Sequence, residues 1–272
     1  MRFAGARERG SITIVGVPYE GVISGLPGAK EGPYHVRKAS YLLETYVPEL
    51  GVDVRDVQLA DMGDVEPFGC PKKAAKEVEE VVTGVRYPVI IGGDHSVTVG
   101  AVRALKKRYG ELRVLYLDAH LDLREEYGGS AHSHACTAAR IAETGAHISF
   151  FGVRSGTREE WAGAGEMDVH RAGERWPTEF REPVYITVDM DVFDPAFAPG
   201  VGTPEPAGIT PAEFFSWLHN IDAEIVGVDV VETNPLVEGN ITPVLAAKVV
   251  RNAVAKMWLS GVQGKGAPWK NI

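Results

Sequence analysis

The sequence predicts an α/β fold, one doubly wound domain with a mainly parallel sheet. Short runs rich in β-branched residues recur along the chain, and each is followed by a longer segment with helical spacing. This alternation favours a parallel sheet that helices cover on both faces. No repeat, low-complexity tract or linker divides the 272 residues, so we expect a single domain over 1–272.

The elements of this domain can be placed along the chain. Strands are predicted at 11–18, 56–63, 87–93, 112–120, 147–154, 183–191 and 224–232. Helices are predicted at 33–46, 72–84, 96–109, 135–144, 210–219 and 241–258. In the last helix, we expect Thr242 to be the cap and Pro243 to lie in the first turn. The Gly- and Pro-rich stretch 193–208 is a long loop of the kind that is often functional.

Charge and composition limit the possible partners. The chain has 28 basic and 37 acidic side chains, a net charge of -9, which argues against binding nucleic acid or an anionic membrane and favours a cationic partner. No segment approaches the roughly 18 apolar residues that a membrane span needs. Cys70 and Cys136 are too few for a disulfide framework, so we expect reduced thiols in a cytoplasmic protein.

Acidic and imidazole side chains gather where four of the predicted strands end. The residues concerned are Asp94, His95, Asp118, His120, Asp122, Asp189, Asp191, Asp194, Asp229 and Glu232. Alternate residues of a strand point to the same side, and ligands of open α/β sheets bind beyond the carboxyl ends of the strands. We therefore expect one cluster, in which Asp94, Asp194 and Asp229 have structural roles in turns or caps or support the other residues.

A metal centre explains this cluster. Converging carboxylates repel one another and are costly to desolvate unless a cation neutralises them. Four aspartates and two histidines without a thiolate suit Mn²⁺, with Fe²⁺, Co²⁺ and Ni²⁺ as rivals. Six ligands are many for one ion, so two ions about 3.5 to 4 Å apart and bridged by carboxylates are expected.

The chain resembles the ureohydrolases, the family of arginase and agmatinase. The resemblance rests on "GVPYEGVISGLPGAKEGP", "GGDHS", "DAHLD", "SHACTAAR", "GVRSGTREE", "VDMDVFDPAFAPGVGTPEP" and "DVVETNP", in this order. It implies an α/β/α sandwich with a largely parallel eight-stranded sheet, and a homo-oligomer that is a trimer or hexamer. It also implies two Mn²⁺ per chain. The first would be held by His95, Asp118, Asp122 and Asp189, and the second by Asp118, His120, Asp189 and Asp191.

The resemblance also implies catalytic roles. Asp122 would accept a hydrogen bond from the attacking hydroxide and help to move its proton to the leaving amine. His134 matches the acid/base histidine of the family, and His132 is a less favoured substitute. Glu232 matches the carboxylate that pairs with the substrate guanidinium. The expected reaction is urea release from a small cationic guanidinium compound.

Agmatine is the predicted substrate, giving putrescine and urea. The loop "DPAFAPGVGTPEP" is similar to that of agmatinases, although Val201 and Ala207 depart from the usual pattern. Glu125 and Glu126 would repel a carboxylate and attract an ammonium group, whereas Arg124 could pair with a carboxylate unless a neighbouring glutamate holds it or it points to solvent. Aminopropylagmatine would suit the same acidic residues, and arginine and guanidinobutyrate are further alternatives.

Three other classes of protein compete with this interpretation. A single-zinc deacetylase on a similar scaffold would leave His95, Asp122 and Asp191 without a purpose. A binuclear phosphoesterase would carry its Asp-x-His motif before the Gly-Asp motif, and here "GGDHS" precedes "DAHLD". A non-catalytic metal-binding relative would normally have lost a ligand, and all six are present.

Overall fold

A parallel sheet forms the centre of this computed structural model, which describes residues 1–65, 67 and 69–262. Its strands are β1 (Ile12–Val17), β4 (Leu59–Asp64), β5 (Tyr87–Gly92), β6 (Arg113–Leu117), β7 (His147–Phe151), β8 (Asp168–His170), β9 (Val184–Asp189) and β10 (Ile225–Val231). Within the described residues these eight strands pair in the order β4-β1-β5-β10-β9-β6-β7-β8. Every pair is parallel.

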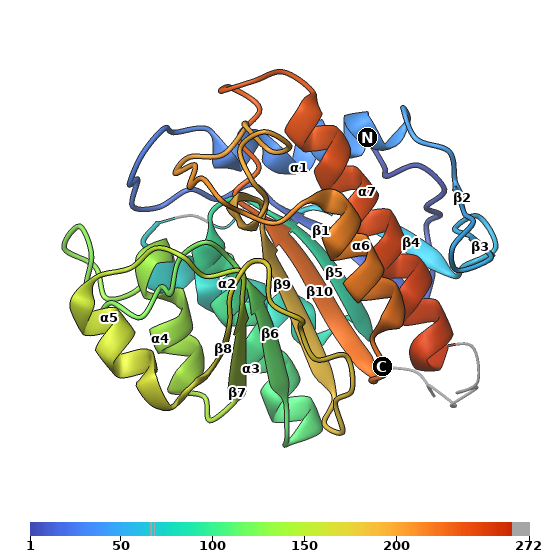
Figure 1. Cartoon of the computed structure of the whole chain (residues 1–272). Helices are drawn as coiled ribbons and strands as arrows, with labels where there is room; N and C mark the ends of the chain where they lie inside the picture. Colours follow the sequence, from blue (N-terminus) through green and yellow to red (C-terminus); the bar gives the residue numbers. More distant parts are fainter. Residues whose placement is uncertain (66, 68, 263–272) are drawn as a thin grey trace.

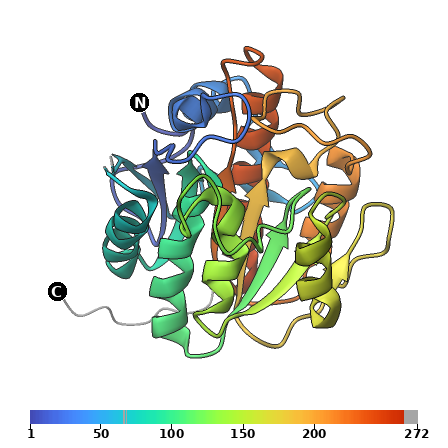
Figure 2. The ribbon, with the colours of Figure 1, turned by 90° about the vertical axis from the view of Figure 1, so that its left-hand side faces the viewer.

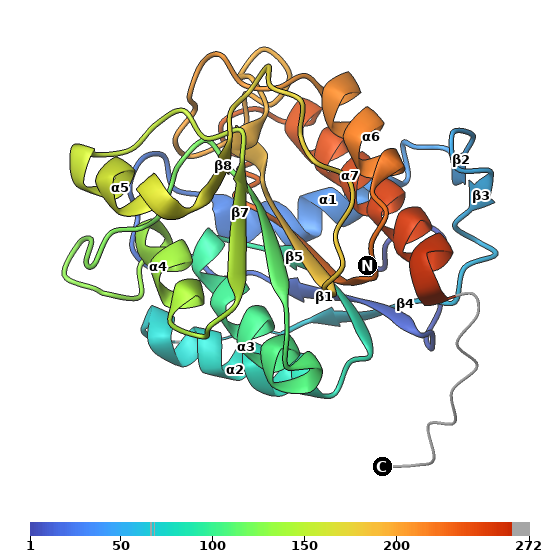
Figure 3. The same cartoon turned by 60° about the horizontal axis from the view of Figure 1, so that its bottom comes forward.

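Helices cover both faces of the sheet (Figures 1 and 3). They are α1 (Gly32–Ser40), α2 (Pro71–Thr83), α3 (Thr98–Tyr109), α4 (Thr137–Ala142), α5 (Arg158–Gly163), α6 (Pro211–Asn220) and α7 (Ile241–Met257). The apolar residues of α1, α6 and α7 share one core with the sheet, and those of α2, α3 and α4 share the other. Figure 2 shows α2 and α3 (teal and green) at the left of the sheet and α6 (orange) on its right.

Shorter elements complete the described chain. They are the antiparallel pair β2 (Tyr46–Val47) and β3 (Val52–Asp53), the 3₁₀ turns η1 (Ala29–Glu31), η2 (His95–Val97), η3 (His134–Cys136), η4 (Ala164–Glu166) and η5 (Met190–Val192), and the π-helical turn η6 (Trp258–Val262). Among the described residues, no helix is long and apolar enough to cross a membrane.

Three of the central strands are buried along their whole length. β5, β9 and β10 have no exposed residue, because a parallel sheet covered on both faces needs apolar side chains on both sides. Thr187 in β9 and Asp229 in β10 are polar exceptions, and they hydrogen-bond each other in the interior. Their partners belong to the site described below.

The predicted fold class is confirmed, and all seven predicted strands are present. β8 and the β2–β3 pair escaped prediction because strands of two or three residues are too short for an alternating pattern to appear. The helix predicted at 33–46 ends at Ser40, since the chain then turns into β2. The prediction of one domain over 1–272 includes 263–272, which lie outside the described residues.

The predicted cap of α7 is wrong. The helix begins at Ile241, and the carboxylate of Glu238 accepts hydrogen bonds from the N–H groups of Asn240, Ile241 and Thr242 at 3.0, 2.8 and 2.6 Å. Thr242 instead accepts a hydrogen bond from the Gly200 N–H at 2.8 Å and so fastens the long loop to the helix. A glutamate three residues before a helix can satisfy the same free N–H groups as a threonine at the cap.

Candidate metal centre

The predicted site residues lie at the carboxyl ends of the four central strands. His95 begins η2 after β5, and Asp118 follows β6 directly. Asp189 is the last residue of β9, and Glu232 follows β10. Because β5, β10, β9 and β6 are neighbours in the sheet, this order brings together residues as far apart in sequence as His95 and Glu232. The position agrees with the ligand-binding edge expected for open α/β sheets.

Short hydrogen-bonded turns orient these side chains. Asp189 accepts a hydrogen bond from the Asp191 N–H at 2.9 Å, which closes η5. Asp94 caps η2 by accepting a hydrogen bond from the Ser96 N–H at 3.0 Å, and its other oxygen accepts one from the Gly21 N–H at 2.6 Å. Asp94 therefore has a structural role, as expected from the sequence.

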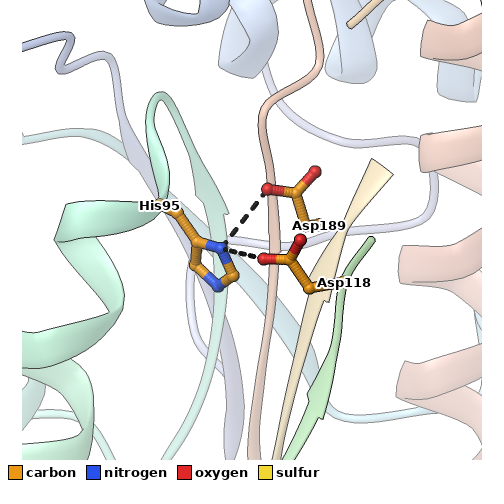
Figure 4. Close-up of side chains that lie close together, drawn as sticks. All are labelled: His95, Asp118 and Asp189. Carbon is orange, nitrogen blue, oxygen red and sulfur yellow. Dashed lines mark ion pairs between the residues drawn. The ribbon is translucent and has the colours of Figure 1, made fainter. Parts of the chain in front are cut away.

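One group of ligand atoms surrounds Nδ1 of His95. This atom lies 3.0 Å from Oδ2 of Asp118, 3.3 Å from Oδ2 of Asp189 and 3.5 Å from Oδ2 of Asp122. Figure 4 shows the His95 ring directed at the carboxylates of Asp118 and Asp189. All four side chains are buried. Their donor atoms can converge on one cation, and for His95, Asp118 and Asp189 they all lie within 4.8 Å of one another.

A second group shares Asp118 with the first. Nδ1 of His120 lies 3.4 Å from Oδ1 of Asp118 and 3.0 Å from Oδ2 of Asp191. The two oxygens of Asp118 thus face different groups, which is the arrangement of a bridging carboxylate. Asp189, the other expected bridge, belongs to the first group and uses its Oδ1 for the Asp191 N–H.

The donor atoms fit a cation. Oδ2 of Asp118 is buried and has no hydrogen-bond partner. Burial and then the charges of Asp191 and Asp118 raise the pKa of Asp189 well above its usual value, and burial and then Asp118 raise the pKa of Asp122 to about 8. Carboxylates in this situation gain from nearby positive charge, which protons or a divalent cation can supply. Metal binding would therefore release protons from the site.

A relay of hydrogen bonds fixes the orientation of His95. Its Nε2 lies 2.9 Å from the hydroxyl of Thr187, and this hydroxyl donates to Oδ1 of Asp229 at 2.5 Å. Oδ2 of Asp229 accepts hydrogen bonds from Thr98 and Tyr185 at 2.8 and 2.6 Å. Because the single hydrogen of Thr187 goes to Asp229, Nε2 of His95 must donate to Thr187. Nδ1 is thereby left with a lone pair for a metal.

Tyr116 contacts two of the candidate ligands. Its ring stacks on the His95 ring with centroids 4.6 Å apart, and its hydroxyl donates to Oδ2 of Asp122 at 2.7 Å. The stacked ring and the bonded carboxylate hold both candidate ligands in place.

Two candidate catalytic residues have left-handed backbones. In the described part of the chain, the non-glycine residues with positive φ are Asp122 at 50°, Glu232 at 60° and Ala207 at 65°. This conformation costs about 1–2 kcal/mol for a residue with a Cβ, and residues of this kind cluster at functional sites. Glu232 uses Oε1 to accept a hydrogen bond from the His95 N–H at 2.8 Å. Burial, followed by Asp94, raises the pKa of Glu232 well above its usual value.

His134, the predicted acid/base residue, lines the cavity that also contains both groups of candidate metal ligands. Nε2 of His134 is 2.6 Å from the hydroxyl of Ser24, and the ring meets Tyr127 edge-on with centroids 5.8 Å apart. Burial is the main cause that lowers the pKa of His134. His132, the substitute, is not among the residues that line the cavity.

The outer part of the cavity differs from the prediction. The cavity has a volume of about 420 Å³, and both metal groups and Glu232 line it. Glu125 and Glu126 do not belong to its lining, and Glu125 instead lies 3.4 Å from Arg140. Arg124 does line it, but its Nε is 3.5 Å from Glu160, a glutamate distant in sequence, rather than near an adjacent one. Glu125 and Glu126 therefore do not line the cavity, as residues that attract the ammonium group of a substrate would be expected to do.

Comparison with known proteins identifies the family. The family model described as "Arginase family" matches residues 10–255. The chain belongs to the arginase family. It is 36% identical over 269 residues to the N(1)-aminopropylagmatine ureohydrolase of Thermococcus kodakarensis, with 92% of each chain covered. It is 35% identical over 263 residues to the agmatinase of Bacillus subtilis, with 90% of this chain and 91% of the relative covered.

A solved structure of the arginase family has the same fold. The agmatine ureohydrolase of Thermoplasma volcanium superposes with a TM-score of 0.87 at 31% identity, covering 97% of this chain and 96% of that one. The predicted resemblance to ureohydrolases and the assignment to this class of hydrolase are confirmed. This result decides against the deacetylase and phosphoesterase alternatives.

Several residues of this arginase-family site were not singled out from the sequence. Thr187 and Tyr116 each stand two residues before a candidate ligand, Asp189 and Asp118, on the same side of the strand. That alternation could have indicated both of them. Ser24 gives no such signal, because a serine in a Gly-rich loop is most often a turn residue.

Proposed function

We propose that this chain is a binuclear manganese hydrolase that releases urea from agmatine. The observation that carries the proposal is the sharing of Asp118 by two carboxylate and imidazole groups that line one cavity with Glu232. The cavity volume of about 420 Å³ is in the range of small-molecule sites. The names of the agmatinase and aminopropylagmatine ureohydrolase relatives support the same substrate class.

The metal ligands that we propose follow the two groups. His95, Asp118, Asp122 and Asp189 would hold the first Mn²⁺, and Asp118, His120, Asp189 and Asp191 the second. The donor set favours Mn²⁺ because it is rich in carboxylate oxygen and has two imidazoles and no thiolate. When bound, the two ions supply Lewis acidity and lower the pKa of water, so that a nucleophile exists near neutral pH.

Three side chains would bind the substrate and transfer protons. A carboxylate can meet a planar guanidinium with two hydrogen bonds, so Glu232 would bind and orient the substrate. Asp122 would accept a proton from the attacking water, because its carboxylate belongs to the first ligand group and lines the cavity. His134 would act as the second acid/base group, because its ring lines the cavity and burial favours its neutral form.

The overall reaction balances without any further reagent. The water oxygen forms a bond to the guanidinium carbon, and the bond from this carbon to the alkyl nitrogen breaks. Both water protons reach the leaving nitrogen, which departs as an ammonium group, so one positive charge stands on each side. Two proton transfers are therefore needed, and Asp122 and His134 are two groups able to make them.

An amine-ended substrate fits the charges of the cavity wall. Glu20 lines the cavity and would attract an ammonium group. The charge of Arg124 is balanced by Glu160, and its guanidinium lies over the Tyr127 ring at 5.2 Å from the centroid. We therefore rank agmatine first and N(1)-aminopropylagmatine second, ahead of arginine and guanidinobutyrate.

A side-by-side assay tests the function. Urea release is measured with Mn²⁺-loaded protein and each of the four substrates, with Asp118→Asn as the inactive control. The kcat/KM should be highest for an amine-ended substrate. A kcat/KM for arginine that equals or exceeds those for agmatine and aminopropylagmatine would refute the substrate assignment. Bound metal without urea from any of the four would indicate a non-catalytic relative.

We further propose a cytoplasmic homo-oligomer, either a trimer or a hexamer. The cysteines support the location, since Cys70 and Cys136 are both free. Light scattering coupled to size-exclusion chromatography gives the number of chains, and a monomer at micromolar concentration would contradict the proposal.

A further inference from the structure

The hydroxyl of Ser24 is hydrogen-bonded to the imidazole of His134. Oγ of Ser24 lies 2.6 Å from Nε2 of His134, although the two residues are 110 positions apart in the sequence. Both residues line the cavity that contains the metal groups and Glu232. A hydroxyl at this distance makes a short hydrogen bond, in which either atom can be the donor.

The loop that carries Ser24 is fastened on both sides of this residue. Before Ser24, the Gly21 N–H donates to the carboxylate of Asp94 at 2.6 Å. After it, the Leu26 N–H donates to the carbonyl of Gly202 at 3.1 Å. The position of the hydroxyl is therefore set by the loop backbone and does not depend on the contact with His134 alone.

A further contact holds the ring of His134, because Tyr127 packs against it edge-on. A neutral imidazole has one N–H and one lone pair, so in one of its two tautomers Nε2 accepts a hydrogen bond from the Ser24 hydroxyl. When the ring is protonated, Nε2 donates to Ser24, and the hydroxyl hydrogen is free to turn into the cavity. The Ser24 hydroxyl can thus both donate a hydrogen bond to Nε2 and accept one from it, as a proton relay requires.

We propose that Ser24 relays a proton from His134 to the leaving nitrogen of the substrate. This inference rests on the proposed urea-releasing function and adds a residue to it. In the step, the N–H bond at Nε2 breaks while an O–H bond forms at Ser24, and the original O–H bond of Ser24 breaks while an N–H bond forms on the leaving amine. The positive charge moves from the imidazole to the departing ammonium group, and Ser24 returns to its starting state.

Replacing the hydroxyl tests the relay. Ser24→Ala should lower kcat for agmatine by about 10- to 100-fold, within the range for a positioned acid/base group. KM and the metal content should stay within about twofold of wild type, because the relay acts after the substrate has bound. Ser24→Thr, which keeps a hydroxyl, should recover most of the rate.

A matched control separates the relay from general loosening of the loops. Ser130 lies in the segment that leads to His134, and its hydroxyl accepts a hydrogen bond from the His132 N–H at 3.2 Å. Ser130→Ala should leave kcat within about twofold of wild type. A loss of kcat in this variant as large as that of Ser24→Ala would attribute the effect to loop order and overturn the relay.

Two other outcomes would also overturn the inference. One is a wild-type kcat in Ser24→Ala, or a change confined to KM. The other is a Ser24→Thr variant as slow as Ser24→Ala. All three results presuppose that wild-type protein releases urea, so they leave the proposed function standing. Wild-type protein that releases no urea from any guanidinium substrate would instead remove the proposed function, and the relay with it.

Discussion

The hydroxyl of Thr187 lies 2.9 Å from Nε2 of His95, on the side of the ring that faces away from the metal groups. Its only hydrogen goes to Asp229, so it can serve His95 only as an acceptor. The tautomer of His95 is thus set by a residue that belongs to neither group of candidate metal ligands. Groups of this kind typically change metal affinity by about 10- to 100-fold.

Thr187→Val should weaken metal binding by about 10- to 100-fold, because the isosteric side chain leaves Nε2 of His95 without an acceptor. Thr187→Ser keeps the hydroxyl and should bind metal with near wild-type affinity. Calorimetric titration of metal-free protein with Mn²⁺ measures both variants. Equal affinities for Thr187→Val and wild type would show that the hydrogen bond from His95 to Thr187 does not affect metal binding.

Asp118 and Glu232 should have separable roles. Asp118→Asn removes the carboxylate that both groups share, so metal occupancy and activity should be lost together. Glu232→Gln should keep the metal and lower kcat/KM, because it removes the charge that meets the guanidinium. Metal analysis and urea release on the same samples measure both effects. The roles would be reversed if Glu232→Gln lost its metal while Asp118→Asn retained it.

His134→Asn should slow turnover by about 10² to 10⁴ and leave the metal content unchanged. The imidazole lines the cavity but lies in neither metal group, so its loss affects proton transfer alone. Added imidazole should restore part of the rate. Full activity in His134→Asn would move the acid/base role to another group, with His132 as the first residue to test.

The sequence predicted the inner site better than its outer wall. Asp118 and Asp189 stand at the ends of apolar strands, where alternation is a local rule that fixes the direction of a side chain. Asp122 lies beyond the end of β6 and has a positive φ, so local turn geometry rather than alternation brings its carboxylate to the site. The outer wall depends on loops. Arg124 is paired with Glu160, which reaches the cavity only through the position of α5, a helix that was not predicted from the sequence. From the local sequence, Arg124 was expected to pair with an adjacent glutamate, but tertiary packing brings Glu160 to it instead.

Ala207 offers a test of backbone strain in the long loop. Its φ of 65° favours glycine, and its N–H donates to Asp194 at 2.8 Å. Ala207→Gly should raise the free energy of unfolding by about 0.5–1 kcal/mol, or Tm by about 1–3 °C. Ala196 is also exposed and donates its N–H to Asp194, but its φ is not positive. Ala196→Gly should therefore destabilise, and equal effects of the two substitutions on Tm would argue against strain at Ala207.

The metal content of active protein tests the central claim most directly. The paired carboxylates at 118 and 122 and at 189 and 191 carry too much negative charge for one ion. Protein reconstituted with Mn²⁺ and freed of loosely bound metal should contain about two ions per chain, and a chelator should remove both the metal and the urea-releasing activity. A fixed content of one ion per chain with full activity would contradict the binuclear account.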